Sequence, residues 1–303
     1  MGTEPAAKGY LPPEDGHEVA WYVYGNPEGL PVLFLHGGPG SGFNTDYLPF
    51  FPLERVCLVT FDQRGCGQSR PHGGTAGNNT QALLRDIERL RGLLKVEKWT
   101  VTGHSWGATL AVLYAKAFPQ HCRSLALASF FGALPEDQIW TFEGIRQFYP
   151  AEQAALEALR PKGDSRRLDF WVYEALGAGE AEELAFRLSS LSSASCRMNP
   201  NPVRREDITP ERIRKWQMLF YYAVNDFFLS PPESLYDGLE KIRKIPFCLV
   251  HGQFDMDCPP AQAFRLKKCL PHMDLRLVAG NHSVAEPEME TAFREIIAES
   301  LSK

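Results

Sequence analysis

Short apolar runs alternate with segments of helical periodicity along much of the chain. Two runs rich in β-branched residues begin at Val32 and Arg55, and each ends at glycine, which is typical of buried strands that lead into loops. Residues 78–95 then change to a helical period. Their apolar positions share one face of the predicted helix, with charged positions opposite: Leu83, Ile87, Leu90 and Leu94.

The same alternation returns near the end of the chain. We expect further buried strands over 100–103, 125–131, 245–255 and 274–280, and a closing helix over 288–301. Strands that alternate with helices favour a parallel sheet covered by helices. The pattern therefore predicts an α/β fold with a mostly parallel sheet flanked by helices.

Residues 133–240 differ in composition and pattern. They contain charged and aromatic-rich helical segments that are interrupted by the stretches RPKGD, RMNPNPVRRED and SPPES. We interpret this segment as an inserted helical cap over a core formed by 1–132 and 241–303. A second independent domain is the alternative. The return of the strand, loop and helix pattern after residue 240 favours the insertion.

Composition and charge narrow the function. The 303 residues are 44% apolar and 23% charged, which excludes a disordered or fibrous chain. A formal charge of −5 gives no basic field, so we expect neither nucleic acid nor a membrane surface as partner. The seven cysteines form no C-x-x-C pair, so we expect reduced, mostly buried thiols, no metal site and no cofactor. Without a leader pattern or a long apolar run we expect a cytoplasmic location.

The stretch Gly103-His104-Ser105-Trp106-Gly107 follows a predicted strand and precedes a predicted helix. G-x-S-x-G in that setting indicates a nucleophile elbow, a tight turn that holds a catalytic serine above the sheet. Small residues are needed beside the turn because the strand and the helix approach closely. We expect Ser105 to be a nucleophile and His104 to point away from it.

A serine nucleophile needs a base, and the base needs an orienting carboxylate. His282 follows the last predicted strand, in a loop that would open at the same sheet edge as Ser105. Asp255 directly follows a strand, and Asp257 lies two residues further. The order Ser105, Asp255, His282 is the one expected for this architecture.

The chemistry also needs hydrogen-bond donors for the oxyanion. The glycine-rich loop His36-Gly37-Gly38-Pro39-Gly40 follows the strand from Val32, where such donors belong. We expect the backbone N–H groups of Gly38 and Trp106 to form the oxyanion hole. A phosphate-binding loop is the rival interpretation, but no Lys-Ser or Lys-Thr follows the glycines.

Five stretches together resemble the proline iminopeptidase family of α/β-hydrolase fold serine peptidases. They occur in the family's order over the two core segments: HGGPGSG, FDQRGCGQSRPHG, GHSWGATLAVLYAKAFP, IPFCLVHGQFDMDCPPAQAFRLKK and AGNHSVAEPE. The resemblance implies an enzyme that removes N-terminal proline from peptides, with Ser105, Asp255 and His282 as its triad. It also implies that Asp255 rather than Asp257 is the acid, and that residues 62–69 form a structural loop beside the site.

The cap resembles the family less. Family members hold the free amine with cap glutamates, one of them in a stretch similar to ARIENHYF, and Val224 stands in the corresponding place here. Asp226 is a candidate substitute, although two residues along a helix turn a side chain by about 200°. Glu174 is the second candidate for substrate binding, with a solvated helix face as the alternative.

Three interpretations of function remain open from the sequence. The first is a peptidase of the proline iminopeptidase type acting on a small molecule or short peptide. The second is an esterase, lactonase or amidase on the same fold, which Val224 and the aromatic residues of the cap favour. The third, a hydrolase-fold binding protein without activity, is disfavoured because every expected catalytic element is present. Oligomeric state is left open.

Overall fold

The fold of the core is an eight-stranded sheet. The computed structural model describes residues 4–178, 181–230 and 235–302. The strands follow the order β1-β2-β4-β3-β5-β6-β7-β8, and all neighbours from β4 to β8 are parallel. Their bounds are β1 Ala7–Tyr10, β2 Ala20–Gly25, β3 Leu30–Leu35, β4 Val56–Phe61, β5 Trp99–His104, β6 Cys122–Ala128, β7 Phe247–Gly252 and β8 Asp274–Val278. The six strands expected from the apolar runs are therefore all present, in the predicted mostly parallel sheet.

The first two strands were not predicted. β1 pairs antiparallel with β2, and β2 pairs antiparallel with β4, so they extend one edge of the parallel sheet. The stretch AWYVYG of β2 is rich in aromatic and β-branched residues, which is a usable strand signal. β1 is mostly exposed, so its sequence carries no apolar alternation.

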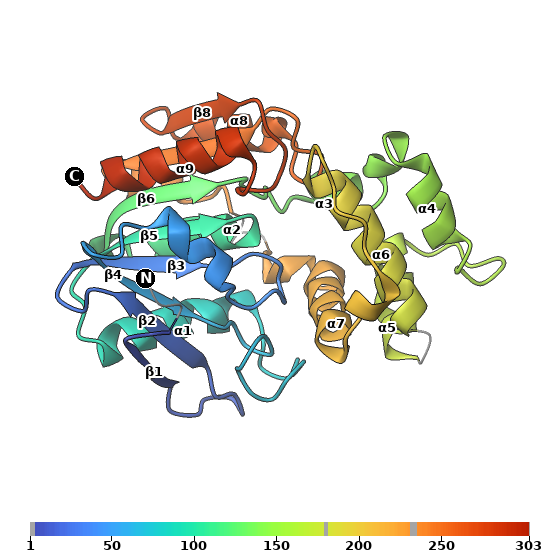
Figure 1. Ribbon diagram of the computed structural model, residues 1–303, viewed down its shortest axis with the longest axis horizontal. Coiled ribbons are helices and arrows are strands. Elements are labelled where there is room, and N and C mark those ends of the chain that lie inside the picture. The colour runs from blue at the N-terminus through green and yellow to red at the C-terminus, as the bar shows by residue number, and fades with distance from the viewer. Residues whose placement is uncertain (1–3, 179–180, 231–234, 303) are drawn as a thin grey trace.

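Helices cover both faces of the sheet (Figure 1). Apolar side chains of α1, α2 and α8 belong to one large core cluster, whereas those of α9 belong to a second cluster on the other face. The bounds are α1 Thr80–Leu93, α2 Trp106–Ala117, α8 Pro260–Cys269 and α9 Pro287–Ser300, with short 3-10 helices at Thr45–Phe50, Pro119–His121 and Leu239–Ile242. Every residue of β5 is buried between these layers, as expected for a central strand.

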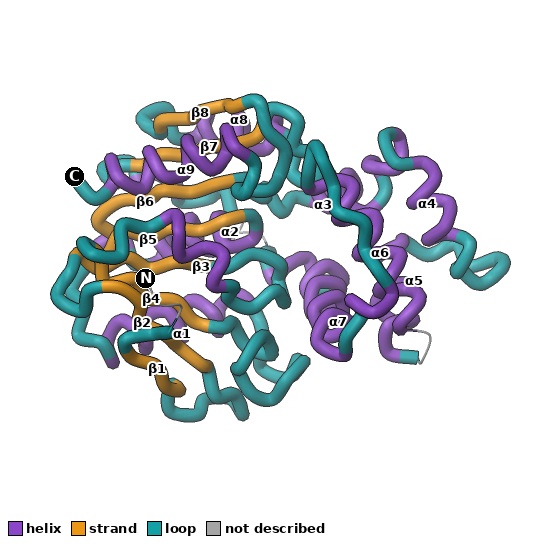
Figure 2. Tube along the Cα trace, viewed as in Figure 1, coloured by secondary structure: helices purple, strands orange, loops and turns teal. Residues whose placement is uncertain are grey.

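Further helices lie between β6 and β7 in the chain: α3 Pro135–Phe142, α4 Pro150–Glu157, α5 Leu168–Gly177, α6 Ala181–Cys196 and α7 Pro210–Val224. Short 3-10 helices accompany them at Gly144–Gln147, Arg205–Asp207 and Asp226–Phe228. In Figures 1 and 2 these helices gather beyond the ends toward which β5 and β6 point. They share a third apolar cluster of their own, around Leu156, Trp171, Leu188 and Phe220. The boundaries 133 and 240 that we assigned to the cap stay a prediction.

Other sequence expectations can be compared with the structure. Four of the seven cysteines are buried, as expected: Cys66, Cys122, Cys248 and Cys258. Within the described ranges, each helix is too short or too polar to cross a membrane. The cytoplasmic location stays a prediction.

Candidate active site

Ser105 lies at a tight turn between β5 and α2. Its φ of 57° and ψ of −126° are uncommon for a residue with a side chain, so the surrounding structure must hold the turn. Its N–H donates to the Ala128 carbonyl at 3.1 Å, which ties the turn to β6. A Cβ atom at Gly103 would overlap the backbone of Gly107, and one at Gly107 would overlap the carbonyl of Leu35. The two glycines of the motif are therefore required by packing around the turn.

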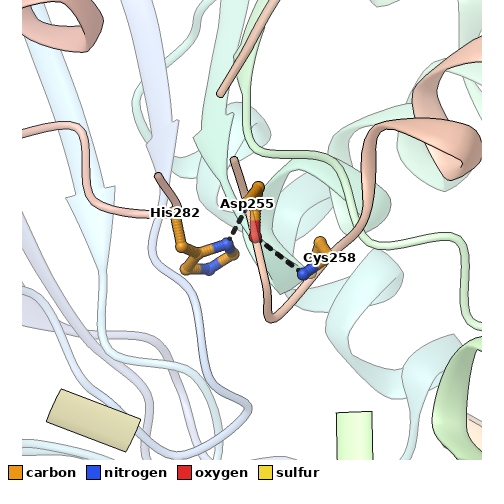
Figure 3. A group of neighbouring side chains, drawn as sticks. All are labelled: Asp255, Cys258 and His282. Atoms are coloured by element: carbon orange, nitrogen blue, oxygen red, sulfur yellow. Dashed lines mark hydrogen bonds and ion pairs between the residues drawn. The ribbon is translucent and has the colours of Figure 1, made fainter. Parts of the chain in front are cut away.

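His282 and Asp255 form a buried pair at the carboxyl ends of β7 and β8 (Figure 3). The Nδ1 atom of His282 lies 2.9 Å from Oδ2 of Asp255. The other carboxylate oxygen of Asp255 accepts the backbone N–H of Cys258 at 2.8 Å, which fixes the plane of the carboxylate. The Nε2 atom of His282 is thereby directed away from the acid. Among the hydrogen bonds of the described residues, none joins Ser105 to His282.

The loop that carries His282 is held by its own backbone. The His282 carbonyl accepts the hydroxyl of Ser129 at 2.8 Å and lies 2.9 Å from Nε2 of His104. The second nitrogen of His104, Nδ1, lies 3.0 Å from the hydroxyl of Tyr47. The side chain of Asn281 accepts the N–H of His282 at 2.8 Å. Three hydrogen bonds to the backbone of His282 therefore hold the loop, and Tyr47 supports His104, which makes one of them.

His104 has contacts that the sequence did not predict. We expected its side chain to point away from Ser105, and this stays a prediction; its ring lines the cavity, with its centroid 4.9 Å from that of His282. Sequence reasoning had no means of finding this role, because the contact joins residues 178 positions apart. His251 was also missed as a neighbour of the site: its Nε2 lies 2.7 Å from the Cys258 carbonyl and 3.4 Å from Asp255.

The protonation states of the site follow from burial and charge. Burial alone would lower the pKa of His282, but the charge of Asp255 and its hydrogen bond outweigh burial and raise that pKa to about 9. Burial would raise the pKa of Asp255, but the charge of His282 holds it below its ordinary value. Burial, together with the charge of His282, lowers the pKa of His104 to about 3. His104 is therefore neutral at any working pH, whereas His282 titrates in the alkaline range.

The ligand atoms of Asp255, Cys258 and His282 lie within 4.8 Å of one another, close enough for one metal ion. The chemistry of the donors argues against that use. Nδ1 of His282 is hydrogen-bonded to one carboxylate oxygen of Asp255, and the other oxygen accepts the N–H of Cys258, so these ligand atoms already have partners. The Asp255 and His282 pair is instead arranged to orient an imidazole.

The glycine-rich loop after β3 packs directly against the serine. A Cβ atom at Gly37 would lie 3.2 Å from the Cβ of Ser105. Gly38, with a φ of 113°, adopts backbone geometry that favours glycine. Trp106 is the first residue of α2, so its N–H lacks a partner within the helix. Gly38 lines the cavity together with Ser105, and Trp106 directly follows Ser105 in the chain. Their role as oxyanion donors stays a prediction.

The loop of residues 62–69 contacts His36 and the side chain of Trp106. The N–H of Gln63 donates to Nε2 of His36 at 3.0 Å, and the Gln63 amide accepts Nε1–H of the Trp106 indole at 3.0 Å. Asp62 accepts the N–H groups of Phe43 and Gln68 at 2.7 and 2.9 Å. These contacts support the structural role that the family resemblance implied for the loop.

Ser105 and His282 both face a cavity of about 500 Å³ between the core and the helices over it. Gly37, Gly38 and Tyr47 line it on the core side. Residues of α3, α6 and α7 contribute a mostly apolar wall: Phe142, Leu188, Leu191, Trp216, Leu219 and Phe220. The cavity is large enough for a small acyl group and part of a peptide, and its walls suit an apolar ring.

The two residues predicted to bind the substrate lie elsewhere. Glu174 of α5 has a side chain that is 64% exposed and is paired with Arg166. Asp226 follows α7, is exposed, and is not part of the cavity wall. These positions correct the expectation that Glu174 or Asp226 holds the amine. The prediction for Glu174 depended on a loose motif match. The prediction for Asp226 failed because the residues around Val224 do not indicate which side of α7 faces the site.

Asp257, which was weighed as the alternative acid, does not contact His282. Its carboxylate points toward the end of α6, where the Ser195 hydroxyl donates to it at 2.5 Å and the Cys196 thiol lies 2.7 Å away. Its own carbonyl accepts the hydroxyl of Thr141 at 2.9 Å. Asp257 lines the cavity with the other groups of the site.

The sheet order, the serine turn and the inserted helices define an α/β-hydrolase fold. A family model described as alpha/beta hydrolase fold matches residues 31–288. A relative from Neisseria meningitidis serogroup B, named proline iminopeptidase, is 32% identical over 98% of this chain and 97% of its own length. A proline iminopeptidase of Arabidopsis thaliana is 33% identical over 94% of this chain and 77% of its own. The chain belongs to the proline iminopeptidase family of α/β-hydrolase fold proteins, and it is a hydrolase.

Solved structures agree on the fold. A membrane phospholipase A superposes with a TM-score of 0.65 at 18% identity, covering 98% of this chain and 87% of the other. The hydrolase of 2-hydroxy-6-oxo-6-phenylhexa-2,4-dienoate from Rhodococcus sp. strain RHA1 superposes with a TM-score of 0.61 at 20% identity, covering 98% and 99%. At such identities the likeness concerns the arrangement of the chain alone.

Proposed function

We propose that this protein is a prolyl aminopeptidase that releases N-terminal proline from short peptides through an acyl-enzyme on Ser105. The observation that carries the proposal is the 2.9 Å hydrogen bond from His282 to Asp255 beside the cavity that Ser105 faces. The names of the most similar relatives support proline as the residue released. They do not favour the esterase interpretation.

In the proposed reaction the Ser105 hydroxyl attacks the carbonyl carbon of the N-terminal prolyl residue. Nε2 of His282 takes the hydroxyl proton, while Asp255 keeps Nδ1–H oriented and stabilises the imidazolium. The N–H groups of Gly38 and Trp106 stabilise the oxyanion. When the intermediate collapses, the peptide C–N bond breaks and His282 returns the proton to the leaving amine.

Water completes the cycle. His282 takes a proton from a water molecule, whose oxygen attacks the ester carbonyl of the prolyl-serine. Collapse of the second tetrahedral intermediate breaks the bond to Oγ of Ser105, which regains its proton from His282. Free proline leaves the site. The reaction requires the Ser105 hydroxyl to reach Nε2 of His282, a hydrogen bond that often forms only when substrate binds.

A panel of chromogenic substrates tests the proposal. The native enzyme should cleave a prolyl arylamide, reject its N-acetyl counterpart, and lose all turnover on Ser105→Ala while a fluorophosphonate ceases to label it. The Ser105→Ala protein should keep its melting temperature. Native protein that hydrolyses a butyrate ester rapidly and leaves the prolyl arylamide intact would replace the peptidase with an esterase.

A further inference from the structure

The cavity wall contains few charged groups. Among its described residues, Asp257 is the sole carboxylate, and Arg197 and Lys215 supply positively charged side chains. Most of the remaining wall is apolar or aromatic. A cation that enters such a cavity is stripped of much of its water and needs an anionic partner there. Asp257 is the group that can provide it.

Asp257 is oriented before any ligand binds. The hydroxyl of Ser195 donates to Oδ1 at 2.5 Å, and the thiol of Cys196 lies 2.7 Å from Oδ2. Both donors are neutral, because burial raises the pKa of the Cys196 thiol well above its ordinary value. Each carboxylate oxygen can accept two hydrogen bonds, so one acceptor position remains on each oxygen.

In the described part of the chain, the charge of Asp257 is not paired by direct contact, although the ammonium group of Lys215, which also lines the cavity, interacts with it. Within the described ranges, no lysine or arginine forms an ion pair with it. The charge of Asp257 also acts on His282. It helps to raise the pKa of His282, although its effect is smaller than those of burial and of Asp255. Asp257 lines the same cavity as Ser105 and His282. Its carboxylate is therefore available to a ligand that reaches these two residues.

We propose that Asp257 accepts the free amine of the substrate and so selects peptides with an unblocked N-terminal proline. This inference rests on the proposed function and names the residue that gives it specificity. The amine of an N-terminal proline is a secondary ammonium with two N–H donors at neutral pH, which matches the two acceptor positions left on Asp257. That nitrogen is bonded to the carbon next to the reacting carbonyl, so its acceptor must lie beside Ser105 and His282.

Ligand binding to the inactive Ser105→Ala protein tests the inference without turnover. L-prolinamide and cyclopentanecarboxamide differ at the ring position that carries the amine, and calorimetry at pH 7 compares them. We expect prolinamide to bind about 10- to 100-fold more tightly, as a hydrogen bond to a charged group provides. Equal affinity would overturn the inference, whether or not any Asp257 variant folds.

Two charge-removing variants then locate the effect. Adding Asp257→Asn to the Ser105→Ala protein should abolish the preference for prolinamide. Adding Glu206→Gln, which removes a carboxylate that is 73% exposed and lies outside the cavity, should leave it unchanged. A preference that survives Asp257→Asn would assign the amine to another acceptor and overturn the inference.

Turnover by the otherwise native enzyme separates this inference from the proposed function. Asp257→Asn should lower the ratio of kcat/KM for a prolyl arylamide to kcat/KM for a butyrate ester about 10- to 100-fold, because only the arylamide carries an amine. Equal losses on both substrates would show a structural role and overturn the inference. If Asp257 binds the amine but no prolyl arylamide is cleaved, the inference stands and the proposed peptidase function is wrong. If prolyl arylamides are cleaved without a role for Asp257, the proposed function stands and the inference is wrong.

Discussion

His282 and Asp255 are joined by a 2.9 Å hydrogen bond in a part of the molecule that water hardly reaches, since their side chains are 8% and 0% exposed. Because the acid holds Nδ1–H, the imidazole can act as a base only through Nε2. The backbone N–H of Cys258 occupies the second oxygen of Asp255, which leaves the carboxylate little freedom to turn. The orientation of the base is thus built into the β7–α8 loop.

Asp255→Asn should remove this orientation. An amide at residue 255 no longer balances the imidazolium and favours the wrong tautomer, so kcat should fall by about 10³- to 10⁴-fold. Steady-state kinetics on the prolyl arylamide measure the loss. Asp257→Asn, assayed on the butyrate ester, is the comparison variant and should not lower kcat, because the loss of its charge only favours the neutral imidazole of His282. Comparable losses from the two variants on the ester would contradict the assignment of Asp255 as the acid.

The pH profile should report the titration of His282. Its pKa is raised to about 9, and only the neutral imidazole accepts the serine proton, so kcat/KM should rise with pH until about 9. The groups facing His282 are Asp255 and Asp257, which raise its pKa, and His104, which stays neutral. His251, near Asp255, also has a pKa lowered by burial. The profile is measured with a butyrate ester and corrected for spontaneous hydrolysis. Because the ester carries no amine, titration of the substrate does not contribute to the rising limb.

The Asp257→Asn variant should shift this pH profile in a predictable direction. Removing one negative charge near His282 should lower its pKa, so the rising limb should move to lower pH. Glu206→Gln should leave the midpoint in place. A rising limb near the ordinary histidine pKa in the native enzyme would show that Asp255 does not stabilise the imidazolium.

The sequence predicted the parts of this molecule whose positions follow from local pattern. Ser105 is flanked by glycines that the packing of β5 and α2 requires, and His282 and Asp255 follow strands whose ends share one sheet edge. The amine site could not be predicted in this way, because it depends on which side of the α6 and α7 helices faces the core. The Asp257 carboxylate is oriented by contacts with Ser195 and Cys196, which lie some 60 residues earlier in the chain.

Glu174 and Asp226 should therefore be dispensable. Glu174→Gln and Asp226→Asn should each keep kcat/KM for the prolyl arylamide within about threefold of the native value, since both carboxylates lie outside the cavity. Exposed ion pairs such as that of Glu174 with Arg166 contribute little to stability, so the melting temperature should also hardly move. If either variant lost activity only on the free-amine substrate, the substituted residue would be the one that binds the amine, as the sequence first suggested.

The loop of residues 62–69 depends on one buried ion pair. Arg64 and Asp86 are both fully buried, with Nε and Oδ2 2.7 Å apart, and Arg64 also donates to the Gly77 carbonyl at 2.8 Å. Arg64→Met would leave the charge of Asp86 with Arg89 alone, at 3.1 Å, so the free energy of unfolding should fall by about 3 kcal/mol. Urea unfolding measures the change.

The double variant Arg64→Met, Asp86→Leu is the control, because it removes the stranded charge together with its partner. It should be more stable than Arg64→Met alone, as expected when the cost of a broken buried pair comes mainly from the charge left behind. Gln63, the next residue in the chain, contacts both His36 and Trp106, so distortion of the loop should also lower kcat on ester and arylamide alike. A single variant as stable as the native protein would show that water or Arg89 satisfies Asp86, and that the loop is held by Asp62 instead.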